Sequence, residues 1–200
     1  MNLANRVTFV RIALAPVYLV AFALGGLWGY IAALLINAAF EITDLLDGYY
    51  ARRDKIVSDM GKLLDPFADS VARFTVLLSI GMAGYASLWM VALIFYRDMT
   101  VANVRMAAIK SGRVVAARAS GKAKAIVQGV GTLIILIGMV VEKAFPYFDA
   151  TRDFMWRGRD AHAWCVLGSH WLMGFITLVT VASAVDYLRA NWDVLTKLER

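Results

Sequence analysis

The sequence is poor in the residues that build disulfides, soft metal sites and chain breaks. Its 200 residues include one cysteine, two histidines and three prolines. The single cysteine, Cys165, cannot form a disulfide within the chain, and it is interpreted as a small buried hydrophobic residue. His162 and His170 are interpreted as structural residues. No Gly/Ser-rich linker, low-complexity segment or repeat of fixed period divides the chain.

Charge is also scarce. Charged residues make up 18% of the chain and hydrophobic residues 60%, with a mean hydropathy of +0.63. This hydrophobic share exceeds the roughly one-half that is usual in soluble domains. Residues 1–200 are therefore predicted to form a single all-α, polytopic membrane domain. The net charge of +6 is attributed to cytoplasmic loops and anionic lipid, because no nucleic-acid-binding module is visible.

Six apolar segments predict six transmembrane helices, since several approach the roughly 20 residues that span a bilayer. The segments cover residues 9–27, 28–52, 61–84, 87–110, 121–142 and 163–187. Residues 1–10 are predicted to begin the chain as a short segment at the membrane surface, and residues 188–200 to end it as an interfacial helix. An uncleaved first helix is favoured over a cleaved signal peptide because further apolar segments follow at once.

The distribution of lysine and arginine orients these helices. Six spans place both termini on one side, which carries fourteen of these residues, whereas the opposite side carries four. Such an excess marks the cytoplasmic side. Both termini are therefore predicted to be cytoplasmic, in a protein of the cell (inner) membrane.

Four aspartates lie where the second and third segments approach the same loop. On a helix, Asp44 and Asp47 are separated by about 60°, and Asp65 and Asp69 by about 40°. Each pair therefore forms an acidic face on a largely apolar helix. A carboxylate is costly at the edge of hydrocarbon, so these acids are interpreted as functional. Because the two helices share a short loop, the two acidic faces are expected to meet.

Four carboxylates with no neighbouring histidine or cysteine form a hard oxygen ligand set. Such a set favours Mg²⁺ or Mn²⁺ over zinc. Gly48 and Ala51 share a face with the first acidic pair and leave room for a ligand or a second helix. Arg52, about 80° from Asp44, is placed to bind a phosphate through two hydrogen bonds. The loop acids Asp54 and Asp59 are interpreted instead as interfacial acids paired with nearby cations.

The spacing of these residues resembles a known signature. The stretch Asp44-x2-Asp47-Gly48-x2-Ala51-Arg52-x8-Gly61-x3-Asp65-x3-Asp69 matches every fixed position in the signature of the CDP-alcohol phosphatidyltransferases. The resemblance covers the whole chain, since that family has six transmembrane helices with the signature on the second and third. The resemblance implies an enzyme that is generally a homodimer. Because the acidic stretch lies on the same side as both termini by the distribution of lysine and arginine, the active site is predicted to face the cytoplasm.

The resemblance also implies a role for each residue of the signature. The four aspartates would surround two divalent ions, Mg²⁺ or Mn²⁺. Asp69 would also be the general base that takes the proton of the acceptor alcohol, whose oxygen attacks the β-phosphorus of CDP-diacylglycerol and releases CMP. The residues implied to border the cytidine diphosphate are Gly48, Ala51, Arg52 and Gly61.

Other segments resemble the branch of this family that makes phosphatidylglycerophosphate, which implies sn-glycerol 3-phosphate as the acceptor. These segments are residues 2–12, Leu64-Asp65-Pro66-Phe67-Ala68-Asp69, Arg97-Asp98 with Arg105, and Ser120-Gly121-Lys122-Ala123-Lys124 with Gln128. A dianionic acceptor needs cations, and the candidates for its phosphate are Arg105, Arg118 and Lys122. Arg73, one turn beyond Asp69, has three interpretations: a pair with Asp69, a pair with Asp98, or a contact with the acceptor.

Three other functions remain open. A sister enzyme of the same family would use inositol phosphate, serine or another polar alcohol as its acceptor. A cation transporter would use the four aspartates as an ion site, although the gap beside Gly48 and Ala51 and the order of the motif speak against it. An intramembrane prenyltransferase also uses aspartate-bound Mg²⁺, but with more spans and a different spacing of acids.

Overall fold

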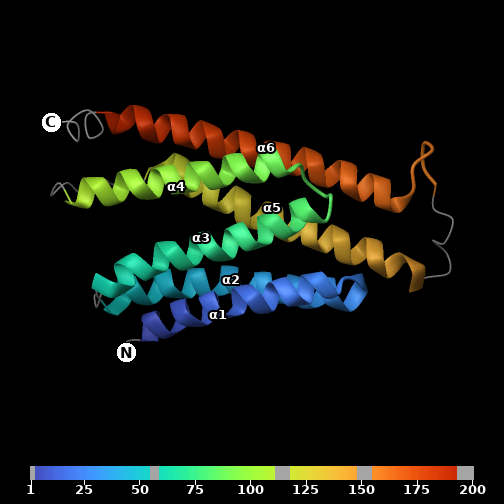
Figure 1. Cartoon of the computed structure of the whole chain (residues 1–200), viewed down its shortest axis with the longest axis horizontal. Helices are drawn as coiled ribbons and strands as arrows, with labels where there is room; N and C mark the ends of the chain where they lie inside the picture. The colour runs from blue at the N-terminus through green and yellow to red at the C-terminus, as the bar shows by residue number, and fades with distance from the viewer. Residues whose placement is uncertain (1–2, 55–58, 111–117, 148–154, 193–200) are drawn as a thin grey trace.

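The computed structural model of the chain describes residues 3–54, 59–110, 118–147 and 155–192. Side chains are described for residues 8–44, 67–105, 108, 118–147 and 155–192. The described residues form an elongated bundle of six α-helices with no β-strand, so the all-α prediction is confirmed (Figure 1). The helices are α1 (Leu3–Leu24), α2 (Gly26–Asp54), α3 (Asp59–Met82), α4 (Leu88–Lys110), α5 (Ala119–Ala144) and α6 (Ala161–Ala190), with a short 3₁₀ helix, η1 (Phe145–Tyr147), after α5.

Helix α1 is longer than the predicted first segment. Residues 3–8, which the sequence analysis assigns to a separate surface segment, continue the same helix as the apolar residues that follow. The break between α1 and α2 falls at Gly25 and Gly26, whose φ angles are +63° and +64°. Glycine adopts this left-handed conformation without steric cost, and two such residues reverse the chain here.

Three helices are long and apolar enough to cross a membrane by length and composition. Within the described residues these are Gly26–Asp44, Ala119–Tyr147 and Ala161–Ala190, and Thr8–Leu24 is a shorter apolar helix. These helices support the prediction of a membrane protein. The described parts of α3 and α4 do not meet the same criterion, and both carry charged side chains.

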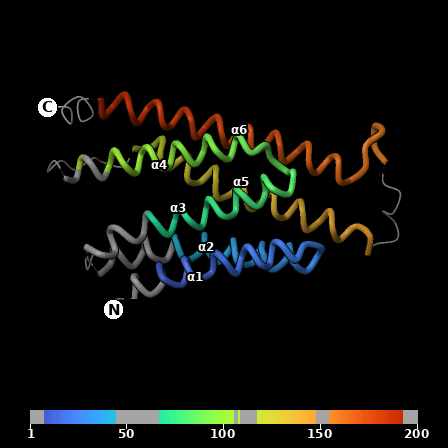
Figure 2. Tube along the Cα trace, viewed as in Figure 1, coloured from blue at the N-terminus to red at the C-terminus, as the bar shows by residue number. Residues whose placement is uncertain are grey.

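Helices α2 and α3 both lie beside α1, and α5 lies beside α2. Helix α1 packs against both α2 and α3, while α5 packs against α2 and α6. On the other side of the bundle α4 and α6 run side by side (Figure 2). The beginning of α1 and the end of α6 lie at the same end of the bundle, as an even number of helices requires (Figure 1).

A continuous hydrophobic core joins these helices at the middle of the bundle. Its fully buried side chains include Tyr18 of α1, Ile80 of α3, Leu136 of α5 and Ile176 of α6. Polar residues gather at one side of this core, between α2, α3 and α5. That polar region is the floor of the cavity described next.

Candidate active site

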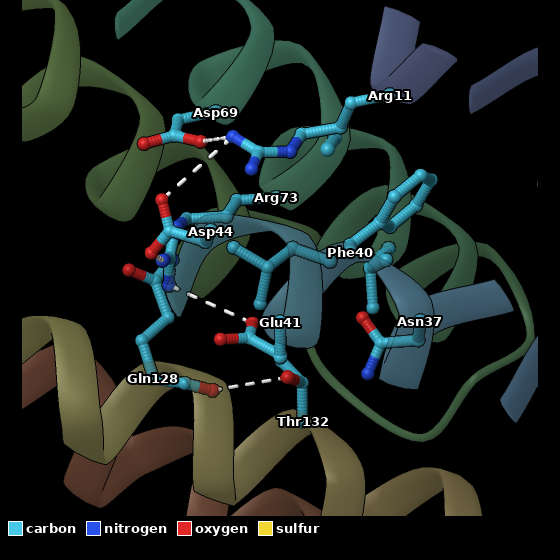
Figure 3. A pocket seen from close by; sticks show the side chains of 12 residues that line it. Arg11, Asn37, Phe40, Glu41, Asp44, Asp69, Arg73, Gln128 and Thr132 are labelled. Carbon is cyan, nitrogen blue, oxygen red and sulfur yellow. Dashed lines mark hydrogen bonds and ion pairs between the residues drawn. The ribbon is translucent and has the colours of Figure 1, made fainter. Parts of the chain in front are cut away.

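A cavity opens between α1, α2, α3 and α5, and charged residues line one side of it. It encloses about 360 Å³, part of which is open to solvent. Helices α2, α3 and α5 contribute residues spaced by about one turn, as expected when one face of a helix borders a cavity. The lining residues are Arg11, Asn37, Phe40, Glu41, Asp44, Asp69, Ala72, Arg73, Val76, Leu77, Gln128 and Thr132 (Figure 3).

Arg11 of α1 joins the two acidic helices. Its Nη1 donates a short hydrogen bond to Oδ1 of Asp69 on α3 and lies 3.7 Å from Oδ1 of Asp44 on α2. Its Nε donates to Oγ1 of Thr43 at 3.4 Å. The Arg11 side chain is only 2% exposed, so its charge needs the two carboxylates that it contacts. The predicted meeting of the two acidic faces therefore holds for Asp44 and Asp69, with a cationic side chain between them.

Arg73 lies on the other side of Asp44. Its Nη2 is 3.5 Å from Oδ2 of Asp44, and its Nη1 is 3.8 Å from Oε1 of Glu41. Both of these ion pairs of Arg73 are with acids of α2, and neither is with Asp69 or Asp98, the two partners predicted for it. Two arginines and three acids therefore alternate along the cavity wall, and each arginine helps to fix the positions of the carboxylates that it contacts.

Close packing between α2 and α5 fixes Glu41. A Cβ atom at position 129 would lie 2.7 Å from Oε2 of Glu41, which is closer than side chains approach one another. Gly129 on α5 therefore leaves the space that the Glu41 carboxylate occupies.

The remaining residues of the signature lie on the predicted helices. The backbone of α2 carries Asp47, Gly48, Ala51 and Arg52, and the backbone of α3 carries Gly61 and Asp65. Their side chains lie outside the part of the chain for which side chains are described. The predicted contacts of these six residues with nucleotide and metal therefore stay predictions.

The described residues include oxygen donors of the kind that divalent cations prefer. Asp44 and Asp69 supply hard carboxylate oxygens from two helices, and they converge on a positive charge at Arg11. Among the described side chains, no three of the His, Cys, Asp and Glu type come together as a metal cluster. The predicted metal site also includes Asp47 and Asp65, whose side chains lie outside the described part of the chain.

The candidates for the acceptor phosphate do not line this cavity. Arg105 of α4 and Lys122 of α5 are exposed. Arg118 forms a bidentate ion pair with Asp186 of α6, in which Nε and Nη2 each lie 2.8 Å from a carboxylate oxygen. Ser120 donates to the same carboxylate at 2.5 Å. Arg118 therefore has to leave Asp186, or share it, before it can bind a phosphate.

A second charged cluster holds α4, α5 and α6 together. Nζ of Lys124 lies 2.7 and 2.8 Å from the two carboxylate oxygens of Asp98. Arg97 also contacts Asp98, at 3.1 Å, and donates to Oγ of Ser183 at 2.9 and 3.1 Å. Lys124 is 6% exposed. Asp98 therefore balances two cations inside the bundle.

Replacing Asp98 by asparagine is expected to destabilise the protein more than replacing Lys124 by methionine. The first change leaves two largely buried cations with a neutral partner, whereas after the second Arg97 still balances Asp98. Breaking a buried ion pair costs about 3–5 kcal/mol, and the Lys124→Met cost is expected to be about half of that. Thermal unfolding of both variants in detergent shows which of the two is destabilised more. Equal or reversed losses would contradict this account of the cluster.

Several residues of the cavity were not identified from the sequence as site residues. Arg11 was counted only among the basic residues and in the opening segment, because its partners are 33 and 58 positions away. Asn37 and Glu41 precede Asp44 by seven and three positions, so they continue its helical stripe. That stripe was the one available signal for both of them.

Comparison with known proteins assigns the chain to a family. The sequence profile of the CDP-alcohol phosphatidyltransferases matches residues 1–158, which include α1 to α5 and the whole signature. The chain belongs to the CDP-alcohol phosphatidyltransferase family. It is therefore a transferase of phospholipid biosynthesis.

Individual members of the CDP-alcohol phosphatidyltransferase family match over most of their length. The chain is 28% identical to the CDP-diacylglycerol–glycerol-3-phosphate 3-phosphatidyltransferase of Bacillus subtilis over 97% of each protein. The protein of the same name from Pseudomonas fluorescens is 29% identical over 98% of this chain and 92% of its own length. That of Pectobacterium atrosepticum is 30% identical over 76% of this chain and 95% of its own length.

Proposed function

We propose that the protein transfers the phosphatidyl group from CDP-diacylglycerol to sn-glycerol 3-phosphate, giving phosphatidylglycerophosphate and CMP. Its relatives carry the name of this activity. The observation that carries the proposal is the meeting of Asp44 and Asp69 across α2 and α3, at the open cavity that their signature predicts. Carboxylates that converge from two helices are the ligands that a metal-assisted transfer of this kind would use.

In the proposed reaction Asp69 accepts the proton of the primary hydroxyl of the acceptor. The hydroxyl oxygen attacks the β-phosphorus of CDP-diacylglycerol, the bond from that phosphorus to the CMP oxygen breaks, and CMP leaves with the electron pair. Arg11 orients the Asp69 carboxylate, and Arg73 orients that of Asp44. Two divalent ions held by Asp44, Asp47, Asp65 and Asp69 would supply positive charge to the attacking and leaving oxygens.

Release of CMP tests this proposal. Purified protein in detergent is given CDP-diacylglycerol, a divalent cation and a panel of acceptors, with parallel samples treated with a chelator. We expect CMP with sn-glycerol 3-phosphate, no CMP after chelation, and recovery with Mg²⁺ or Mn²⁺. CMP with inositol phosphate or serine in place of glycerol 3-phosphate would assign the chain to a sister activity. The absence of CMP with every acceptor would contradict the enzymatic function.

The membrane arrangement that accompanies this function is also a proposal. All six helices are proposed to cross the inner membrane, with both termini and the open end of the cavity on the cytoplasmic side, in a homodimer. The common end of α1 and α6 and the pairing of charges inside the bundle support it (Figure 1). Activity of a reporter that is fused after residue 200 and works only on the side of the membrane away from the cytoplasm would contradict this orientation.

The Arg105→Ala variant tests the acceptor site. Arg105 is exposed on α4, so its loss is expected to leave the fold intact. A hydrogen bond to a charged group contributes about 1.5–3 kcal/mol, so the KM for glycerol 3-phosphate is expected to rise roughly tenfold, with a smaller change for CDP-diacylglycerol. Arg189→Ala, at another exposed arginine, is the matched control. A larger rise for CDP-diacylglycerol would place Arg105 at the nucleotide.

A further inference from the structure

Two amide side chains lie unsatisfied in the wall of the active-site cavity. Gln128 of α5 is 1% exposed, and neither Nε2 nor Oε1 has a hydrogen-bond partner among the residues whose side chains are described. Asn37 of α2 is 2% exposed, and its Nδ2 likewise has no partner within that part of the chain. Both residues line the cavity that holds Asp44 and Asp69.

An unsatisfied amide in this place is costly. A buried donor or acceptor without a partner costs about 1–3 kcal/mol, and native proteins contain few such groups. Helices α2 and α5 both include segments apolar enough to cross a membrane, where such groups are expected to serve function. The neighbouring Thr132 shows the usual solution, because its hydroxyl donates to the backbone oxygens of Gln128 and Gly129 at 3.0 Å.

The position of the amides relates them to the reacting groups. Figure 3 shows the Gln128 side chain extending from α5 toward Arg73 and Asp44, on the charged side of the cavity. Gln128 also borders a second cavity, of about 220 Å³, together with Arg73 and Leu77. Asn37 precedes Asp44 by two helical turns, or about 10 Å along α2, so it lies deeper in the bundle.

The chemistry of Gln128 favours a ligand group that both donates and accepts hydrogen bonds. Its amide offers one donor and one acceptor atom, and both are unpartnered. A phosphate oxygen or an ester carbonyl only accepts hydrogen bonds, so it would leave Oε1 unsatisfied. An ammonium group only donates, so it would leave Nε2 unsatisfied. A neutral hydroxyl both donates and accepts, and it satisfies both atoms.

We propose that Gln128 binds the non-reacting hydroxyl of the polyol acceptor and so makes the site specific for acceptors that carry it. The inference rests on the proposed function, because glycerol 3-phosphate carries a secondary hydroxyl next to the primary hydroxyl that reacts. With the primary hydroxyl at Asp69, the secondary hydroxyl is one carbon away, in the cavity that Asp69 and Gln128 both line. Gln128 is therefore a substrate-binding residue that exchanges no proton with the reacting atoms.

A comparison of two acceptors tests the inference. 3-Hydroxypropyl phosphate has the primary hydroxyl and the phosphate of glycerol 3-phosphate but no secondary hydroxyl. A site built to hydrogen-bond a hydroxyl strongly rejects an analogue without it, so the wild-type protein is expected to prefer glycerol 3-phosphate by roughly 100-fold or more in kcat/KM. Gln128→Met is expected to reduce this preference at least about tenfold, by lowering kcat/KM for glycerol 3-phosphate alone.

The controls separate this role from a structural one. Thr132 lines the same cavity, but its hydroxyl donates to carbonyl oxygens of its own helix. The Thr132→Val variant is therefore expected to keep the wild-type preference between the two acceptors. Thermal unfolding of Gln128→Met is expected to occur at the wild-type temperature or higher, because no hydrogen bond within the protein is lost. An equal loss of kcat/KM with both acceptors would contradict the inference.

A second arm distinguishes the acceptor from the nucleotide, whose ribose also carries hydroxyls. CDP-diacylglycerol and its 2′-deoxy analogue are compared as donors in the wild type and in Gln128→Met. If the change in preference appears between the donors and not between the acceptors, Gln128 serves the ribose and the inference is wrong. It is also wrong if the wild-type protein uses both acceptors equally well, since the amides then bind water only. If the wild-type protein releases no CMP with glycerol 3-phosphate, the proposed function itself fails and the inference with it.

Discussion

Replacing Asp69 by asparagine is expected to lower CMP release by roughly 100- to 10,000-fold, the range contributed by a positioned general base. The amide cannot take the proton of the acceptor alcohol. Asparagine has nearly the same shape and can still accept the hydrogen bond from Arg11, so the helix packing around it is expected to remain. The release of CMP with glycerol 3-phosphate measures the effect, and thermal unfolding in detergent verifies the fold.

The matched control for Asp69→Asn is the same change at Asp160. Asp160 caps the beginning of α6, where its Oδ1 accepts a hydrogen bond from the backbone nitrogen of Ala163 at 2.7 Å. Asparagine caps helices about as well as aspartate, so this variant is expected to keep its activity. If Asp69→Asn also kept substantial activity, another group would have to be the base, and Asp69 would remain only a candidate ligand.

Replacing Arg11 by methionine is expected to impair both stability and catalysis. Arg11 holds α1 to α2 and α3 through Thr43, Asp44 and Asp69. Loss of its charge leaves two neighbouring carboxylates to repel one another. Because these carboxylates are 38% and 34% exposed, water screens part of the effect, and the free energy of unfolding is expected to fall by about 2–3 kcal/mol.

The catalytic effect of Arg11→Met follows from the position of Asp69. A displacement of about 1 Å in a reacting group costs about 100-fold in rate, and Arg11 is the hydrogen-bond donor that fixes Asp69. We therefore expect CMP release to fall by about that factor. Arg11→Lys keeps the positive charge but has one nitrogen in place of the three of the guanidinium group, so its activity is expected to be intermediate. Arg189→Met is the control at an exposed arginine.

Both measurements are needed to interpret Arg11. An unstable protein with full activity per folded molecule would show that Arg11 only ties the helices together. A stable, inactive protein would show that it acts on the carboxylates alone. Wild-type stability together with wild-type activity would contradict the ion pairs as they are described.

Much of the site was accessible from the sequence because helices repeat locally. The spacing of Asp44 from Asp47, and of Asp65 from Asp69, places each pair on one helical face whatever the rest of the chain does. A short loop then brings α2 and α3 together at their acidic ends. The family signature depends on the same spacing, and the profile match to residues 1–158 agrees with it.

The partners of the cationic residues depended on the tertiary structure. Arg118 was predicted as a phosphate ligand, yet the structure pairs it with Asp186, 68 positions away. Arg73 contacts Asp44 and Glu41, which were not among the partners considered for it. Each pairing depends on how one helix is rotated against another, and a sequence taken alone does not contain that rotation.

The sequence by itself therefore determined the helices, the acidic faces and the family of this protein, because these depend on spacing along the chain. Only the tertiary structure decided that Arg11 of α1 lies between Asp44 and Asp69 and that Gln128 of α5 faces the same cavity without a partner among the side chains that the structure describes. In the sequence Gln128 is one polar residue in an apolar helix. The sequence does not show that its amide lacks hydrogen-bond partners, because that depends on which side chains of the neighbouring helices surround it.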